Sequence, residues 1–410
     1  MRAALRLPAF PRLLGAYAVS QLGDWAAEVA LAVLVYGLTE SPAAVALTWL
    51  VHRCLLGLTA PLLVARLERH RPQRLLPALA LAQAAIFAAL ALSAGRAGLA
   101  GILALVAADG LIAPVSRALV RATIAAVTRP AGLLAQGNAA VNVAFTTNAM
   151  LAAAVGGILT ATLGAPAALA FNALTFLAVA ALLGSAPLPH NAGDDGQQDH
   201  ATARDALRAA VAYVRDQRPL GLMLGAYAAF TVFAMAITPV EVVLVRGTLH
   251  AGSAALGVVL GAWGVGMIVG GALVGRIQRR VGLAALLIGA AVAEAVAFLG
   301  MGLSAGVAEV VAFAALGGAG NGLEGVLFMT AVQERVSDAF QARVSGLMEA
   351  LMTAAVGVGF LAGGTVASLA GARATYLTAG LGGLAVVAWT LVRLRAHAKP
   401  ERALGALAPA

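Results

Sequence analysis

The chain contains very little charge, cysteine or lysine for its 410 residues. Charged residues make up 11% of it, whereas soluble proteins carry about 25%. Cys54 is the one cysteine, which excludes an internal disulfide and a metal cluster built on cysteines. Lys399 is the one lysine and lies near the C-terminus, so a P-loop lysine for ATP is missing. We therefore expect no cofactor and no metal site.

Apolar residues are abundant instead. They account for 61% of the chain, against about 45–50% in soluble domains. A soluble protein of this size could not bury so much apolar surface, so the solvent around the chain must be lipid. The net charge of +9 does not indicate nucleic-acid binding, because the basic residues sit in short gaps between apolar runs. The composition predicts an all-α integral membrane protein in a lipid bilayer.

Twelve apolar segments are long enough to cross a bilayer, for which a helix needs about 20 residues. Six of them precede one long polar stretch and six follow it. In that stretch Leu207, Val211 and Val214 recur at helical spacing, which predicts an amphipathic helix on the membrane surface. The predicted organisation is a six-helix bundle at 1–184, a cytoplasmic linker with that helix at 185–219, a second bundle at 220–396 and a cytoplasmic tail at 397–410.

The Lys and Arg residues orient the chain, because the cytoplasmic loops of membrane proteins are enriched in them. With the N-terminus in the cytoplasm, all but four of the 27 Lys and Arg residues fall on the cytoplasmic side. The exceptions are Arg96, Arg246 and Arg373 outside and Arg53 within a span. We predict a multi-pass protein of the cytoplasmic membrane with both termini in the cytoplasm.

The two predicted bundles carry related loops at equivalent places. After the second span the chain reads Pro-Leu-Leu-Val-Ala-Arg-Leu-Glu-Arg at 61–69. After the eighth span it reads Gly-Ala-Leu-Val-Gly-Arg at 271–276, followed by Arg279 and Arg280. Parallel six-helix repeats of this kind are typical of transporters.

Several motifs are similar to those of one transporter family. The first span contains Ser-Gln-Leu-Gly-Asp at 20–24 and ends in a Leu-Thr-Glu-Ser-Pro turn at 38–42. The sixth span contains Phe-Asn-Ala-Leu-Thr-Phe at 171–176. In this ordered set the chain resembles the major facilitator superfamily, and within it the bacterial branch of enterobactin and drug exporters. The resemblance implies the major facilitator fold, with twelve transmembrane helices in two six-helix bundles, and a secondary transporter that works by alternating access.

The acidic residues in the first half and the missing ATPase motif fit a proton-coupled exporter. We expect it to act as a monomer on a small amphiphilic molecule of drug, antibiotic or siderophore type. The chain departs from the family pattern at Val64, which replaces a Gly, and at Glu68-Arg69, which replaces Asp-Arg. An importer or a lipid carrier of the same fold is the alternative. A membrane enzyme would need clustered histidines or carboxylates, and a transport-inactive receptor usually adds a soluble domain; the sequence displays neither.

Ionisable residues inside spans are candidate site residues, because each costs at least about 2.5–3.5 kcal/mol at the bilayer centre. Asp24 and Glu28 lie four residues apart in the first span and share a helix face. Arg53 in the second span lies at about the depth of Glu28, so an ion pair is reasonable. These three residues form either a structural clamp between helices or a proton- or substrate-coupling site. Asp24 and Glu28 repel each other, so we expect one of them to be protonated for part of the time.

Asp109 lies near the middle of the fourth span, where Gly110 and Pro114 favour a bend. No basic residue is close to it in sequence. Such a carboxylate is a candidate proton site or a contact for a cationic solute. The alternative is a hydrogen bond to a polar side chain of another helix.

Further polar residues are candidates for lining a cavity, although such residues more often bond across helices or, near a span's end, reach the surface. These candidates are Gln21, Asn138, Asn142, Glu241, Asn321 and Glu324. Glu294 lies in the ninth span, which is peripheral in the family, and we expect a structural role for it.

A last group is predicted to form a cytoplasmic gate. In the family, the loop residue at the place of Glu68 sits against the N-terminus of the eleventh helix, where Arg343 lies here. The alternative is that Glu68 only balances neighbouring arginines in solvent. The predicted gate residues are Glu68, Arg69, Arg74, Arg276, Arg280 and Arg343.

Overall fold

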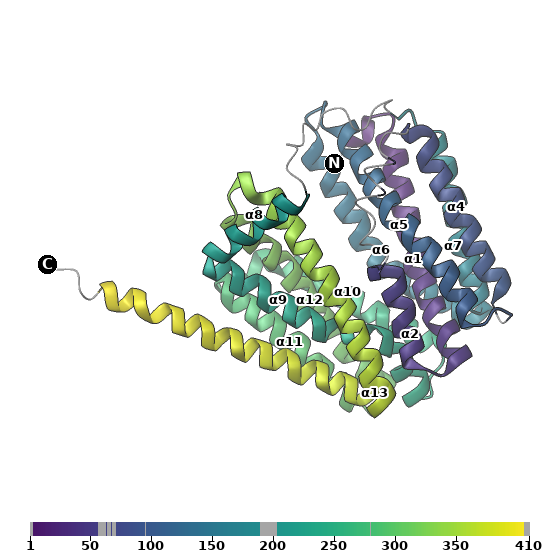
Figure 1. The fold of residues 1–410 in the computed structure, drawn as a ribbon. Helices are drawn as coiled ribbons and strands as arrows, with labels where there is room; N and C mark the ends of the chain where they lie inside the picture. The colour runs from purple at the N-terminus through teal and green to yellow at the C-terminus, as the bar shows by residue number, and fades with distance from the viewer. Residues whose placement is uncertain are drawn as a thin grey trace. The chain divides into compact units, whose positions relative to one another are not determined.

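The computed structural model describes residues 3–55, 63, 67, 71–94, 96–188, 203–278 and 280–405, and every regular element among them is a helix (Figure 1). The elements before the polar stretch are η1 (Ala4–Arg6), α1 (Phe10–Thr39), α2 (Pro42–Trp49), η2 (Leu50–Leu55), α4 (Pro72–Ser93), α5 (Leu99–Thr128), α6 (Leu134–Leu163) and α7 (Ala165–Gly184). Those after it are α8 (Ala203–Asp216), α9 (Arg218–Ala236), η4 (Thr238–Val240), η5 (Val243–Thr248), α10 (Ser253–Ile277), α11 (Leu283–Leu303), α12 (Val307–Arg335) and α13 (Asp338–Gly405).

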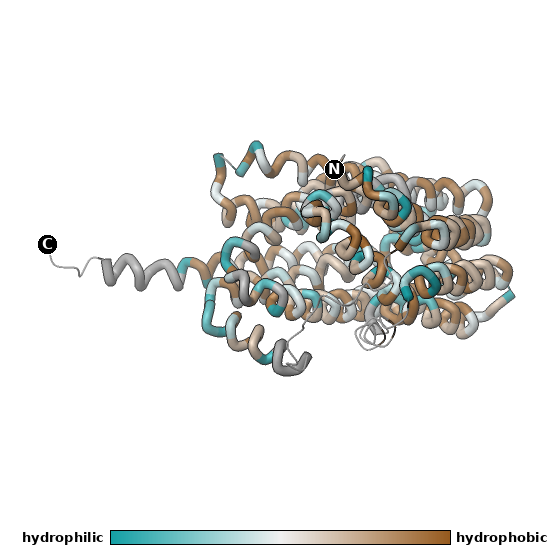
Figure 2. Tube along the Cα trace, turned by 90° about the horizontal axis from the view of Figure 1, so that it is seen from above, coloured by the Kyte–Doolittle hydropathy of each residue, from teal (hydrophilic) through white to brown (hydrophobic). Residues whose placement is uncertain are grey.

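Nine helical stretches within the described ranges are long and apolar enough to cross a membrane. One of them, Arg343–Arg395, has 53 residues and so the length of two spans. Figure 2 shows brown, apolar colour along the helices and teal, polar colour mostly at their ends and connections. Large side chains also point outward, since Leu92, Leu163 and Leu369 are 76%, 68% and 83% exposed. The chain is therefore an all-α, multi-pass membrane protein, and its helices accommodate the predicted twelve spans.

Two glycines turn the chain at equivalent places in its two halves. Gly164 separates α6 from α7 with φ 86° and ψ 164°, and Gly371 breaks α13 with φ 86° and ψ 169°. A positive φ of this size is strained for any residue with a Cβ, so glycine is required at both turns. The same turn in the same position supports the internal repeat that the loop sequences predict.

The chain divides into two compact units. Unit 1 comprises Met1–Gln198 and Pro239–Gly264, and unit 2 comprises Asp199–Thr238 and Val265–Ala410. Of the predicted second bundle, only Pro239–Gly264 thus groups with the first unit. The predicted bundle and linker boundaries remain predictions.

Unit 1 is built around α1, which packs on α6 and α7, while α4 packs on α7 and α5. Small residues permit these close approaches. A Cβ on Gly156 of α6 would lie 2.6 Å from the Cα of Ala26 in α1. A Cβ on Gly157 would collide with the Cα of Gly257 in α10. The first part of α10, which comes from the second half of the chain, therefore packs closely on α6 within this unit.

Unit 2 is built around α9, α11, α12 and α13, which pack on one another. At one end of the unit, buried Leu224, Phe328 and Val344 form part of an apolar cluster. The amphipathic helix α8 lies against this end, where the ring of Tyr213 stacks on Phe340 with centroids 4.3 Å apart. The hydroxyl of Tyr213 also accepts a hydrogen bond from the backbone N–H of Ser337, which lowers the pKa of that hydroxyl.

Candidate functional site

Asp24 of α1 meets a side-chain donor from α7. The amide nitrogen of Asn172 donates to Asp24 Oδ1 over 3.4 Å. Thr175 Oγ1 donates to Asn172 Oδ1 over 2.9 Å, which fixes the amide so that its nitrogen faces the carboxylate. Asn172 is fully buried, so this donor is held in place by packing.

Gly23 makes this contact possible. A Cβ at position 23 would collide with the side-chain oxygens of Asn172 and Thr175. The Gly-Asp pair of the first span and the Asn-x-x-Thr of the sixth span therefore meet in space. These two segments are among those that carry the family resemblance.

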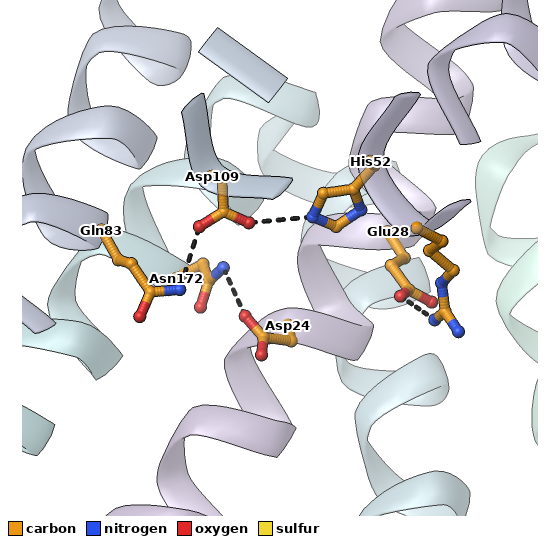
Figure 3. Close-up of polar contacts among 7 residues, drawn as sticks. Asp24, Glu28, His52, Gln83, Asp109 and Asn172 are labelled. Atoms are coloured by element: carbon orange, nitrogen blue, oxygen red, sulfur yellow. Dashed lines mark hydrogen bonds and ion pairs between the residues drawn. The ribbon is translucent and has the colours of Figure 1, made fainter. Parts of the chain in front are cut away.

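Asp109 of α5 is bonded through both of its carboxylate oxygens (Figure 3). Gln83 of α4 donates to Oδ1 over 2.9 Å, and His52 Nε2 of η2 lies 2.8 Å from Oδ2. The Asp109 side chain is 2% exposed and that of His52 is 15% exposed. Gly110 allows the close approach, since a Cβ there would lie 2.9 Å from the backbone oxygen of His52. Of the alternatives left open for Asp109, the geometry provides hydrogen bonds to other helices, one of them to a titratable group.

Glu28 and Arg53 form the ion pair that their depths suggest (Figure 3). The Arg53 guanidinium also lies over the rings of Trp25 and Trp49, 5.6 and 5.4 Å from their centroids. The side chain of Glu28 is 13% exposed and that of Arg53 is 40% exposed. The carboxylate is therefore shielded while its arginine partner borders open space.

These contacts form three neighbouring groups in unit 1, which together are called its network. Asp24 lies within electrostatic range of Glu28, His52, Asp109 and Arg117. A histidine beside a carboxylate is the arrangement in which a proton can be held and passed on near neutral pH. Among the described residues, His, Cys, Asp and Glu side chains form no group of three that could hold a metal ion.

Unit 2 places two carboxyl groups against each other. Glu294 of α11 is 1% exposed and Glu324 of α12 is 6% exposed. The two carboxyl groups interact electrostatically, and Asn321 lies beside Glu294. Gly320 lets the helices meet here, because a Cβ on it would lie 2.7 Å from the oxygen of Ala290 and 3.3 Å from Glu294 Cβ. Glu294 thus pairs with a predicted cavity residue, a contact that its peripheral span does not suggest.

The remaining predicted cavity residues fall in different environments. Gln21 is 7% exposed, Asn138 is exposed, and Glu241 and Asn321 are partly buried. The side chain of Asn142 lies outside the described part of the structure. The structure brings Asn321 and Glu324 together, whereas Gln21 is a buried residue of α1.

The predicted gate is only partly described. Glu68 and Arg69 lie outside the described residues, so their contact with the eleventh helix stays a prediction. Arg74, Arg276 and Arg280 are exposed. Arg343 is partly buried with its guanidinium 5.4 Å from the ring centroid of Phe340.

Three residues of the unit 1 network are missing from the set predicted from sequence. His52 stands next to Arg53 in the sequence, but its side chain faces Asp109. Gln83 is a polar residue in an otherwise apolar span, which is itself a usable signal. Asn172 belongs to a quoted motif, although its partner could not be read from one span alone.

The sequence profile of the transmembrane secretion effector family matches residues 2–406. The comparison with curated protein sequences finds no match. The crystal structure of the nucleoside transporter NupG is similar with a TM-score of 0.70 and 13% identity, covering 94% of this chain and 98% of that one.

Two further solved structures are similar over comparable lengths. A bacterial homologue of the iron transporter ferroportin, in the inward-facing state, has a TM-score of 0.69 and 16% identity, covering 94% of this chain and 99% of that one. The human organic anion transporter MFSD10 has a TM-score of 0.59 and 20% identity, covering 93% of this chain and 100% of that one. At these identities the structures demonstrate a shared fold and nothing finer.

Proposed function

The chain belongs to the transmembrane secretion effector family and is a secondary transporter of the major facilitator fold; on this premise we propose that it exports small amphiphilic molecules in exchange for protons. The observation that carries the proposal is the His52–Asp109 pair, set inside unit 1 beside Asp24. A membrane transporter that keeps titratable groups in its spans, at a cost to insertion, retains them for a function.

The proposed proton site consists of Asp109 and His52 together with Asp24. Gln83 and Asn172 supply neutral donors that hold the two carboxylates in place whether or not a proton is present. Protonation of Asp109 would remove its attraction to a charged His52 and so weaken the link between α5 and η2. A proton then biases the conformational equilibrium through the different strength of this link in different states.

Glu28 and Arg53 are proposed to couple substrate to this site. Arg53 is the member that reaches open space, and it is flanked by two indole rings. An amphiphilic molecule can contact the rings with its apolar part and the exposed edge of the ion pair with its polar part. If Glu28 and Arg53 are only a structural clamp, they make the same contacts, but neutralising their charges should leave transport unchanged.

The proposed setting follows from the arginine distribution. The protein lies in the cytoplasmic membrane with both termini in the cytoplasm and acts as a monomer. The family's description as secretion effectors favours export over import. The substrate class, of drug, antibiotic or siderophore type, rests on the resemblance of the first- and sixth-span motifs.

Proton-coupled export is tested by flux in proteoliposomes that carry an imposed pH gradient and a trapped pH dye. Lipophilic cations, antibiotics and siderophores are added one at a time, and proton and substrate movements are recorded together. We expect movement in opposite directions, and a loss of proton movement of at least about tenfold in Asp109→Asn and Asp24→Asn.

Glu309→Gln is the matched control, because Glu309 is an exposed carboxylate at the start of α12 and outside the network. It should keep full coupling. Movement of proton and substrate in the same direction would instead establish an importer. Unchanged gradient dependence in both network variants would leave only the structural clamp.

A further inference from the structure

Unit 2 contains a pocket apart from the network of unit 1. It lies between α9, α11, α12 and the last part of α13, and its volume is about 170 Å³. An apolar cavity of about 150 Å³ is enough to hold a benzene ring. The pocket can therefore take an aromatic ring, with the rest of a larger molecule extending from its mouth.

The walls of the pocket are apolar and aromatic. Tyr227 and Phe328 lie parallel with ring centroids 3.7 Å apart, and Phe230 lines the pocket from the same helix as Tyr227. Leu287 and Ile288 of α11 form the facing wall. Such walls favour a ligand with an apolar, aromatic body.

One carboxyl group interrupts this apolar wall. Glu324 lines the pocket although its residue is 6% exposed, and Tyr227 lies within its electrostatic range. Behind it stands Glu294, whose Oε2 is buried without a hydrogen-bond partner. The lining also includes Arg335, but it lies eleven residues further along α12, or about 16 Å by the helix rise, and its guanidinium donates to the backbone of Ala331. The ionisable group beside the Tyr227–Phe328 stack is thus a carboxyl group.

We propose that this pocket binds a lipophilic cation. The apolar body of the ligand lies against Phe230, Leu287 and Ile288. Its positive centre faces Glu324 and the ring of Tyr227, since a cation is attracted both to a carboxylate and to an aromatic face. The inference deepens the proposed function and rests on it, because it assigns a substrate class and a binding site to the same transporter.

The test is equilibrium binding to the full-length protein in lipid nanodiscs without any gradient. The probes are tetraphenylphosphonium, a lipophilic cation with phenyl rings, and triphenylphosphine oxide, which is similar in shape and neutral. We expect Glu324→Gln to weaken tetraphenylphosphonium binding by about tenfold or more and to leave the neutral probe within about twofold. Glu309→Gln, a charge-matched change at an exposed position on the same helix, should leave both unchanged.

A second pair of variants tests the location without touching the carboxyl groups. Ala284 lines the pocket, whereas its exposed neighbour Ala285 does not. Ala284→Trp should weaken binding of both probes, and Ala285→Trp should weaken neither. Equal loss of both probes in Glu324→Gln, or unaltered cation binding in both Glu324→Gln and Ala284→Trp, would overturn the proposal.

The outcome separates this inference from the proposed function. Binding is measured without a pH gradient, so a protein that fails to exchange protons can still bind the cation. Coupled flux with unaltered cation binding in both Glu324→Gln and Ala284→Trp would retain the exporter and remove the pocket. Cation binding that depends on Glu324, without coupled flux, would do the reverse.

Discussion

The two units treat their buried carboxyl groups in opposite ways. In unit 1, Asp109 is bonded to His52 and Gln83, and Asp24 to Asn172. In unit 2, Glu294 and Glu324 face each other. A carboxylate with donors around it can remain charged, whereas two carboxyl groups in contact require a proton or another cation between them. Under the proposals made above, the first arrangement exchanges a proton and the second binds a cation.

Close approach at a glycine is common to both arrangements. Because Gly23 has no side chain, Asn172 can reach Asp24. Because Gly320 has none, the backbone of α12 can pack against Glu294. The contrast between the units therefore comes from the residue types that face the carboxyl groups and not from the way in which the helices pack. Substitutions at these positions test the contrast directly.

The largest expected effect is on folding stability, when a carboxyl group is replaced by an apolar side chain. Asp109→Leu leaves His52 and Gln83 without their acceptor, and each buried group left unsatisfied costs about 1–3 kcal/mol, so we expect a loss of about 2–6 kcal/mol. Glu294→Met removes one of two repelling groups and should alter stability by less than about 1 kcal/mol. Thermal unfolding in detergent measures both.

The reverse ranking would break the comparison. If Glu294→Met destabilised the protein more than Asp109→Leu, the carboxyl pair of unit 2 would be a structural bond of the same kind as the contacts in unit 1. A stabilising effect of Glu294→Met would sharpen the comparison, because it would show the pair to be retained against its cost in stability.

A smaller effect is expected where packing alone is changed. Gly23→Leu should destabilise the protein by about 1–3 kcal/mol, because its side chain would collide with Asn172 and Thr175 and push α7 away from α1. Gly37→Leu is the matched control on the same helix, where a Cβ would meet nothing within 4 Å. Transport coupled to protons should be lost in the first variant and kept in the second.

Equal behaviour of the two glycine variants would contradict the account of Asp24. It would mean that α7 can shift at little cost and that Asn172 is not held against the carboxylate. Measuring stability and coupled transport in the same preparations distinguishes a general folding defect from the loss of one contact.

The fold was largely predictable because lipid imposes a strong rule on the sequence. Apolar runs of spanning length predict the helices, and the helical, multi-pass character is confirmed. The Glu28–Arg53 contact was also predictable, since the depth of a residue along each of two neighbouring spans can be counted from the sequence. These inferences need only distances along one helix axis.

Contacts that depend on rotation about the helix axis were harder to predict. Depth does not tell which way a side chain faces, so the pairing of His52 with Asp109 required the π-helical turn of η2 and the gap at Gly110. The pairing of Glu294 with Glu324 likewise required the crossing of α11 and α12 at Gly320. A glycine beside a buried acid is a sequence signal for such a crossing, although it does not identify the partner.

The smallest expected effect on stability concerns Arg53 of unit 1. Arg53→Ala removes a partly exposed ion pair, worth about 0–1 kcal/mol, and the contacts with Trp25 and Trp49, worth about 0.5–1 kcal/mol, so we expect a loss of about 0.5–2 kcal/mol. Arg53→Lys keeps the charge but not the planar guanidinium, and should cost less than about 1 kcal/mol.

Arg335→Ala in unit 2 is the control, because the Arg335 contact that the structure gives is to the backbone of its own helix. This variant should unfold at the temperature of the unaltered protein. Salt screens exposed charge pairs more than ring contacts. High ionic strength should therefore reduce, but not abolish, the difference in unfolding temperature between the unaltered protein and Arg53→Ala. A difference that disappears completely would assign the whole effect to the ion pair with Glu28. A difference that salt leaves untouched would assign it to the two indole rings, and Arg53 would then be held by packing and not by the carboxylate it faces.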